Sequence, residues 1–187
     1  MGTLFIATTL AGQGLEALDA YNATSLRQQR HAMLGLGAWA VANIGVGLAG
    51  RASTQGTQRH FHEMNALWNT VNLAIAGFGY YSALSSDPTT WDLATSLTKH
   101  QNFQKILLFN AGLDVGYVVG GFCLRERARR PDANRERLQG FGNSIILQGG
   151  FLLVFDVVNY VIATGLNDDL PLRLGATANG LGLLLSF

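Results

Sequence analysis

The sequence predicts an all-α integral membrane protein, an antiparallel four-helix bundle, on three observations. Four apolar segments are each about 20 residues or longer, which at about 1.5 Å per residue matches the roughly 30 Å hydrocarbon layer of a bilayer. Charged residues make up only 13% of the 187 residues, against about a quarter in ordinary soluble domains. Most of the 23 glycines lie inside the apolar segments, where small residues let membrane helices pack closely.

The chain divides into three parts. Residues 1–30 are an apolar lead followed by an amphipathic helix at 15–30, expected to lie on the membrane surface or on the bundle. The lead lacks the positive region of an export signal, so both a trimmed signal remnant and a plain apolar lead stay open. Residues 31–165 hold the bundle, and residues 166–187 form a short C-terminal tail or hairpin. The four membrane-spanning helices are predicted at 31–50, 61–84, 103–124 and 141–165.

Arginine placement predicts the orientation. Arg51 and Arg59 flank the first connection, and the third connection, 125–137, is rich in arginine. If all four helices cross, both connections lie on one side, which the positive-inside tendency makes cytoplasmic. We therefore expect a multi-pass protein of the bacterial inner membrane with both termini outside the cytoplasm.

The second apolar segment carries regularly spaced amides that share one helical face with His62 and Gly79. Amides and acids recur one turn from an aromatic residue in the other segments too, so that polar groups converge in depth. Such groups are costly in hydrocarbon and are expected to point into the bundle. The predicted polar layer or ligand-binding set is Asn43, Asn65, Asn69, Asn72, Asn110, Asp114, Gln148, Asp156 and Asn159.

Two roles for this layer remain open. In the structural one, the amides and a protonated acid hydrogen-bond across helices and fix their register, each bond contributing about 0.6 to 2 kcal/mol. In the functional one, Asp114 and Asp156 lie near each other and bind or move a proton or cation.

The third apolar segment repeats GxxxG through Gly112, Gly116 and Gly120. This glycine zipper allows close helix contact, either within one chain or between two copies. Spacing alone leaves both arrangements open.

Several function classes find no support. The net charge of +1 gives no electrostatic basis for nucleic-acid binding, and Cys123 is the single cysteine. The four histidines, His31, His60, His62 and His100, fall near predicted helix ends and are expected at the interface rather than on a metal. We expect no catalytic residue, metal site or cofactor, and a non-enzymatic role is favoured. A membrane enzyme or haem protein that uses the histidines stays open as a third class.

The stretches RQQRHAMLGLGAWAVANIG and FHEMNALWNTVNLAIAGFG resemble a family of uncharacterised bacterial four-helix membrane proteins. The resemblance covers mainly the first two helices and implies a topology without an activity. The function expected first is a structural or partner-binding role in the membrane, with lipid, a second copy or another membrane protein as partner. The alternative is a small transporter or channel-like protein that moves protons or cations, or binds a small ligand, through the bundle interior.

Overall fold

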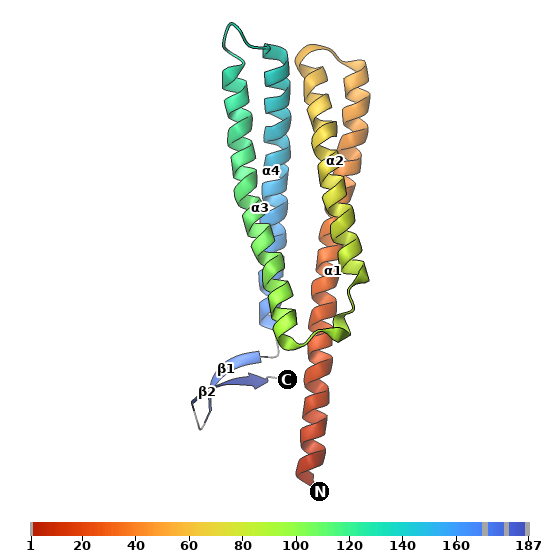
Figure 1. Cartoon of the computed structure of the whole chain (residues 1–187), viewed down its shortest axis with the longest axis vertical. Helices are drawn as coiled ribbons and strands as arrows, with labels where there is room; N and C mark the ends of the chain where they lie inside the picture. Colours follow the sequence, from red (N-terminus) through yellow and green to blue (C-terminus); the bar gives the residue numbers. More distant parts are fainter. Residues whose placement is uncertain (1, 170–171, 178–179, 186–187) are drawn as a thin grey trace.

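The computed structural model describes residues 2–169, 172–177 and 180–185. Its four helices are α1 (Gly2–Ser53), α2 (Gly56–Ser85), α3 (Leu93–Arg127) and α4 (Arg135–Gly165). They run alternately up and down, with the connections α1–α2 and α3–α4 at one end and α2–α3 at the other (Figure 1). The predicted all-α antiparallel four-helix bundle is confirmed.

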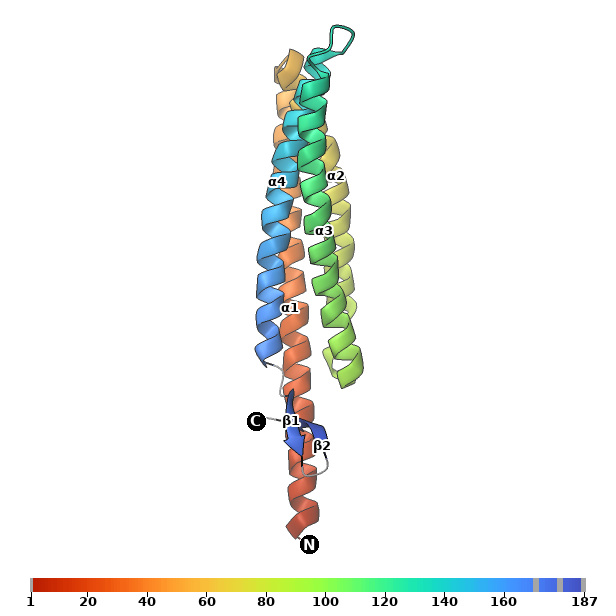
Figure 2. The same cartoon turned by 90° about the vertical axis from the view of Figure 1, so that its left-hand side faces the viewer.

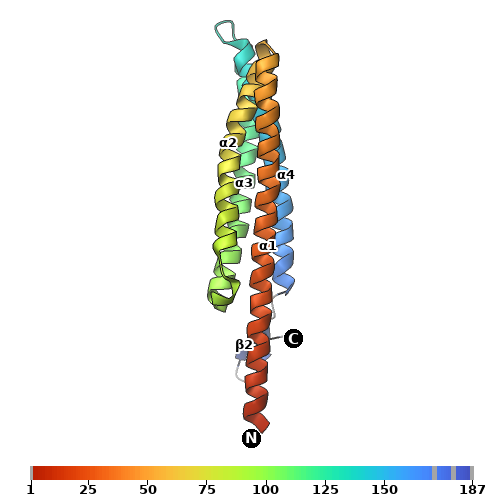
Figure 3. The ribbon, with the colours of Figure 1, turned by 90° about the vertical axis from the view of Figure 1, so that its right-hand side faces the viewer.

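Helix α1 is the longest element and contains both the amphipathic segment and the first apolar segment. Its 52 residues correspond to about 78 Å of helix, so that its first turns project beyond the bundle (Figure 3). Its amphipathic part packs on the bundle rather than lying apart from it. Leu18 and Tyr21 are buried, and Asn22 Nδ2 donates to the carbonyl of Pro88 at 3.0 Å, in the 3₁₀ turn η1 (Pro88–Thr90).

Side-chain caps define where α3 and α4 begin. The backbone N–H of Thr95 donates to Asp92 Oδ1 at 2.8 Å, and that of Arg137 donates to Asn134 Oδ1 at 3.2 Å. Each cap satisfies a backbone donor that the first helical turn leaves free. The hydrogen bonds from Thr95 also hold the pKa of Asp92 below its ordinary value.

The distribution of side chains is the reverse of that in a soluble bundle. The largest fully buried side chains are all polar: His100, Gln148, Asn22, Asn65, Asn69, Ser96 and Ser144. Large apolar side chains instead cover the outside of all four helices, with Phe78 79% exposed and Phe109 67% exposed. A polar interior under an apolar surface is stable where the surroundings are hydrocarbon.

Three described helical stretches are long and apolar enough to cross a membrane, namely 14–53 of α1 and the whole of α3 and α4. Helix α2, which contains the expected span 61–84, is not among them because its asparagines and histidines lower its hydropathy. Those asparagines are buried in the bundle, whereas Leu67 and Phe78 on its other faces are exposed.

The helices associate as two pairs, α1 with α2 and α3 with α4, and the pairs meet chiefly where α2 packs on α4. Glycines occupy the closest approaches. A Cβ on Gly121 of α3 would lie 2.8 Å from the carbonyl oxygen of Gly142 of α4, and one on Gly140 would lie 2.5 Å from that of Thr57. The predicted glycine zipper of Gly112, Gly116 and Gly120 has no side-chain or neighbouring-helix atom within 4 Å of its Cβ positions, so it packs on no other part of the described chain.

After α4, the turn η2 (Leu166–Asp169) leads to the strands β1 (Leu172–Thr177) and β2 (Gly180–Leu185). The strands pair antiparallel with Leu172 opposite Leu185, which is the hairpin alternative predicted for the tail. They lie at the end of the molecule from which α1 projects (Figure 2).

Candidate functional site

A cluster of amides joins α1, α2 and α4 in the middle of the bundle. Gln148 is fully buried and accepts a hydrogen bond from Trp39 Nε1 at 2.9 Å. Its Nε2 donates to Asn65 Oδ1, and Asn65 Nδ2 in turn donates to Asn43 Oδ1 at 2.9 Å. Because each amide meets another directly, this part of the polar layer leaves no room for a ligand.

The amides of α2 continue this cluster along the helix. Asn69 Nδ2 donates to the carbonyl of Asn65 at 2.8 Å, and Asn72 Nδ2 donates to Asn69 Oδ1 at 3.2 Å. Asn72 is the last member and also lines a cavity. The predicted layer is therefore continuous on α2 but changes character at Asn72.

That cavity has a volume of about 580 Å³ and is walled by all four helices. Its polar lining near the bundle centre consists of Asn72, Asn110, Asp114 and Asp156. Both carboxyl groups are buried, with 2% of Asp114 and 6% of Asp156 exposed, and they line the same cavity from α3 and α4. Within the described chain, Asp114 Oδ2 is buried without a hydrogen-bond donor.

The cavity is elongated along the bundle. On α2 its lining runs from Trp68 to Ser82, a rise of about 21 Å. At the end of the cavity nearest the bundle centre, the rings of Trp68 and Tyr117 lie edge to face with centroids 4.8 Å apart. Gln29 and Ser82 line the opposite end, towards the α2–α3 connection.

The remaining lining is apolar or aromatic, and it is the part that the sequence prediction did not include. Phe103 and Phe155 line the cavity in addition to Trp68 and Tyr117. Sequence spacing predicts two of these four aromatic lining residues. Trp68 precedes Asn72 by four residues and Tyr117 follows Asp114 by three, so each shares a helical face with a predicted polar residue.

Asn159 belongs neither to the amide cluster nor to the lining of this cavity. Its Nδ2 donates to the carbonyl of Phe155 within α4, while its own carbonyl accepts from Gln28 Nε2 at 3.1 Å. It lines a separate shallow pocket with Arg27 and His31 on the α1–α4 side. The structure thus brings together the other eight predicted residues and leaves this one apart.

His100, expected near a helix end, is buried inside the bundle. His100 is 2% exposed, and its Nε2 lies 2.9 Å from the carbonyl oxygen of Ala163. The Ser25 hydroxyl lies 3.2 Å from Nδ1, and the side chain of Gln104 lies 2.9 Å from Nε2. The ring of Tyr21 packs on the imidazole edge to face. These contacts join α1, α3 and α4 at the end of the bundle that holds the α2–α3 connection.

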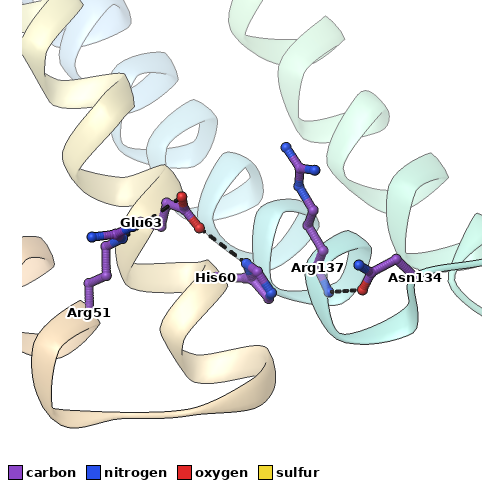
Figure 4. A network of polar contacts seen from close by, with 5 residues as sticks. All are labelled: Arg51, His60, Glu63, Asn134 and Arg137. Atoms are coloured by element: carbon purple, nitrogen blue, oxygen red, sulfur yellow. Dashed lines mark hydrogen bonds and ion pairs between the residues drawn. The ribbon is translucent and has the colours of Figure 1, made fainter.

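The arginine-bearing connections meet at the other end of the bundle (Figure 4). His60 Nδ1 and Glu63 Oε2 lie 3.1 Å apart, and Arg51 Nε lies 3.8 Å from Glu63 Oε1. A Cβ on Gly56 would lie 3.1 Å from Glu136 Oε1, so the two connections are adjacent. Their common side, on which the predicted orientation depends, is a feature of the fold.

Among the residues that the structure describes, no group of three or more His, Cys, Asp or Glu side chains is placed to hold a metal ion. The chemistry available in the cavity is that of two buried carboxyl groups, three amides (Gln29, Asn72 and Asn110) and aromatic rings. This set can hydrogen-bond a ligand and attract a positive charge.

Comparison with known proteins adds a family but no activity. No curated protein and no solved structure matches the chain. One family model matches residues 35–157, well over half of the chain. The matched range holds the whole amide cluster and both cavity aspartates and ends before Asn159. The chain therefore belongs to DUF6992, a family of unknown function.

Proposed function

We propose that this protein binds a small, largely apolar molecule inside the membrane, in the cavity between its two helix pairs. The observation that carries the proposal is the cavity itself, about 580 Å³ in volume and lined mainly by apolar and aromatic side chains with two buried carboxyl groups. Ligand sites are concave, mostly apolar and equipped with a few convergent polar groups.

The extent of the lining favours binding over conduction. The lining stops at Leu36 on α1, Trp68 on α2, Tyr117 on α3 and Leu152 on α4, near the bundle centre. Beyond this level the amides of Asn65 and its partners are paired directly. A continuous path for protons or cations would have to cross that paired cluster.

The test uses diphenylhexatriene, a neutral apolar dye that absorbs tryptophan emission. Of the three tryptophans, only Trp68 lines the cavity. We expect saturable quenching of tryptophan fluorescence by the dye in lipid nanodiscs, and loss of most of that quenching in Trp68→Phe.

A matched pair of variants separates the cavity from the lipid-facing surface. Val71 lines the cavity and is 60% exposed, while Val154 is 62% exposed and lies outside it. Val71→Phe should weaken dye binding about fivefold, which corresponds to about 1 kcal/mol, and Val154→Phe should leave it unchanged. Equal binding by all three proteins would refute the cavity as the site.

The amide cluster supports a second role, which is structural. Gln148, Asn65 and Asn43 satisfy one another with no space between them. Such a cluster fixes the positions of α1, α2 and α4 relative to one another, because any slip leaves buried amides unpaired. The structural role expected first from the sequence is thus proposed for this half of the layer, where removing Gln148 should lower stability.

We place the arginine-bearing connections in the cytoplasm of a bacterial cell and both termini outside it. The support is that the connections 54–55 and 128–134 lie at one end, with Arg51 and Arg59 flanking the first and six arginines between residues 125 and 137 in or beside the second. In a Cys123→Ala background, Asp132→Cys should react with an impermeant maleimide only in inverted vesicles, and Thr90→Cys only in intact cells. The opposite labelling would reverse the orientation.

A further inference from the structure

The paired aspartates of the cavity define what kind of ligand it takes. Asp114 and Asp156 line the cavity from two packed helices, and Asp114 Oδ2 has no donor in the described chain although only 2% of the residue is exposed. A buried acceptor of this kind is left unsatisfied unless a ligand or water supplies a donor or a positive charge. The cavity reaches this atom, so a ligand can supply it.

Among the side chains that the structure describes, none in the cavity lining provides a positive charge. These lining residues include neither lysine, arginine nor histidine, and those of α1 and α2 include no titratable group. Tyr117, on α3, is the one titratable residue of the described lining besides the two aspartates. A charged carboxylate in such surroundings is costly unless a cation or a proton accompanies it.

Two buried carboxyl groups that line one largely apolar cavity do not both ionise without a cation, because burial and the neighbouring negative charge each disfavour the second carboxylate. The pair therefore keeps a proton when no cation is bound. Binding a monovalent cation while releasing one proton leaves the total charge of the site unchanged.

The aromatic lining suits the body of an organic cation. Trp68 and Tyr117 lie one helical turn from Asn72 and Asp114, and the faces of such rings attract ammonium groups. The rest of the elongated cavity is mainly apolar up to Gln29 and Ser82 at its far end, which accommodates a hydrocarbon or aromatic chain extending from the charged group towards Ser82.

We propose that the ligand is an amphipathic organic ammonium ion, whose charged group binds between Asp114 and Asp156 and displaces the proton that they share. This inference rests on the proposed function and specifies its ligand class. The proton leaves to the solvent, and no covalent bond of the ligand forms or breaks.

Two dyes with one fluorophore test the inference. Diphenylhexatriene is neutral, and its trimethylammonium derivative carries a fixed positive charge without an acidic proton. With quenching of Trp68 as the readout, we expect the cationic dye to bind at least about tenfold more tightly, and Asp156→Asn to remove the difference. Asp132→Asn, in the exposed α3–α4 connection, is the matched control and should keep it.

Proton release gives a readout on the unmodified protein and so does not depend on the folding of any variant. In weakly buffered solution, binding of the cationic dye should release about one proton per site, and its affinity should rise up to about tenfold per pH unit where the pair holds its proton. Equal affinities for both dyes without proton release would overturn the cation inference and leave the binding function standing. Absence of quenching by either dye would overturn both.

Discussion

Gln148 provides the most direct test of how the bundle is held together. The substitution Gln148→Leu keeps a side chain of similar size but removes the acceptor of Trp39 and the donor to Asn65. Hydrogen bonds between membrane helices contribute about 0.6 to 1.7 kcal/mol each. Loss of these two bonds should therefore lower the free energy of unfolding by about 1 to 3 kcal/mol.

The assay is reversible unfolding in mixed micelles of a mild detergent and dodecyl sulfate, followed by circular dichroism. Gln139→Leu, on the same helix but outside the amide cluster, is the matched control and should change stability by less than about 0.5 kcal/mol. A double-mutant cycle with Asn65→Leu should show a coupling energy of at least about 0.5 kcal/mol, because the second substitution removes the amide that the first leaves unpaired. Equal stability of Gln148→Leu and the unmodified protein would refute the structural role of the cluster.

Two further predictions concern helix contacts and helix ends. Gly121→Ala should destabilise the bundle by about 1 to 3 kcal/mol, because its Cβ would meet Ile146 Cγ1 at 2.6 Å. Gly116→Ala, where the added Cβ enters open space, should not destabilise it. Equal losses of stability in the same unfolding assay would contradict the packing of α3 on α4. Asp92→Ala should lower stability at neutral pH, and since the pKa of Asp92 is held low by Thr95, its contribution should be lost as the pH falls through that lowered pKa. Unfolding measured at neutral and acidic pH should therefore show the two proteins converging, and a constant difference would count against the cap.

Helical periodicity accounts for what could be predicted of the site. The spacing of Asn65, Asn69 and Asn72 puts them on one face of any α-helix, and a face of amides in an apolar segment has to turn inward. Gln148, Asp114 and Asp156 follow the same argument and are buried. The shared face and the burial of these residues follow from the sequence of each helix taken alone.

The division of the layer into a paired cluster and a cavity depends on how the helices meet, and periodicity does not contain that information. Close approach of α2 to α4 pairs Asn65 with Gln148, whereas Asn72, Asn110 and Asp114, further along α2 and α3, border open space. The same limit applies to the glycines. The GxxxG spacing is a property of one helix, but the contact between α3 and α4 is made by Gly121, outside the repeat.

His100 is buried because α3 begins earlier than the apolar span predicts. The helix begins at Leu93, ten residues before the predicted span at 103, so His100 lies two turns inside it. A local signal was present: Asp92 is a favourable N-cap residue, and its side chain accepts from Thr95. With the helix starting at this cap, His100 falls on the same helical face as Leu107, and both residues are buried.

The two halves of the polar layer are mechanically linked through α4. Gln148 and Asp156 are eight residues apart, or about 12 Å along the helix axis, and Leu152 between them lines the cavity. By pairing with α1 and α2, Gln148 fixes the position of α4 and so the position of Asp156 opposite Asp114. Gln148→Leu should therefore weaken binding of the cationic dye by about fivefold, equivalent to about 1 kcal/mol, while Gln139→Leu should not. If Gln148→Leu destabilises the bundle but leaves dye affinity unchanged, the amide cluster stabilises the fold without positioning the carboxyl pair.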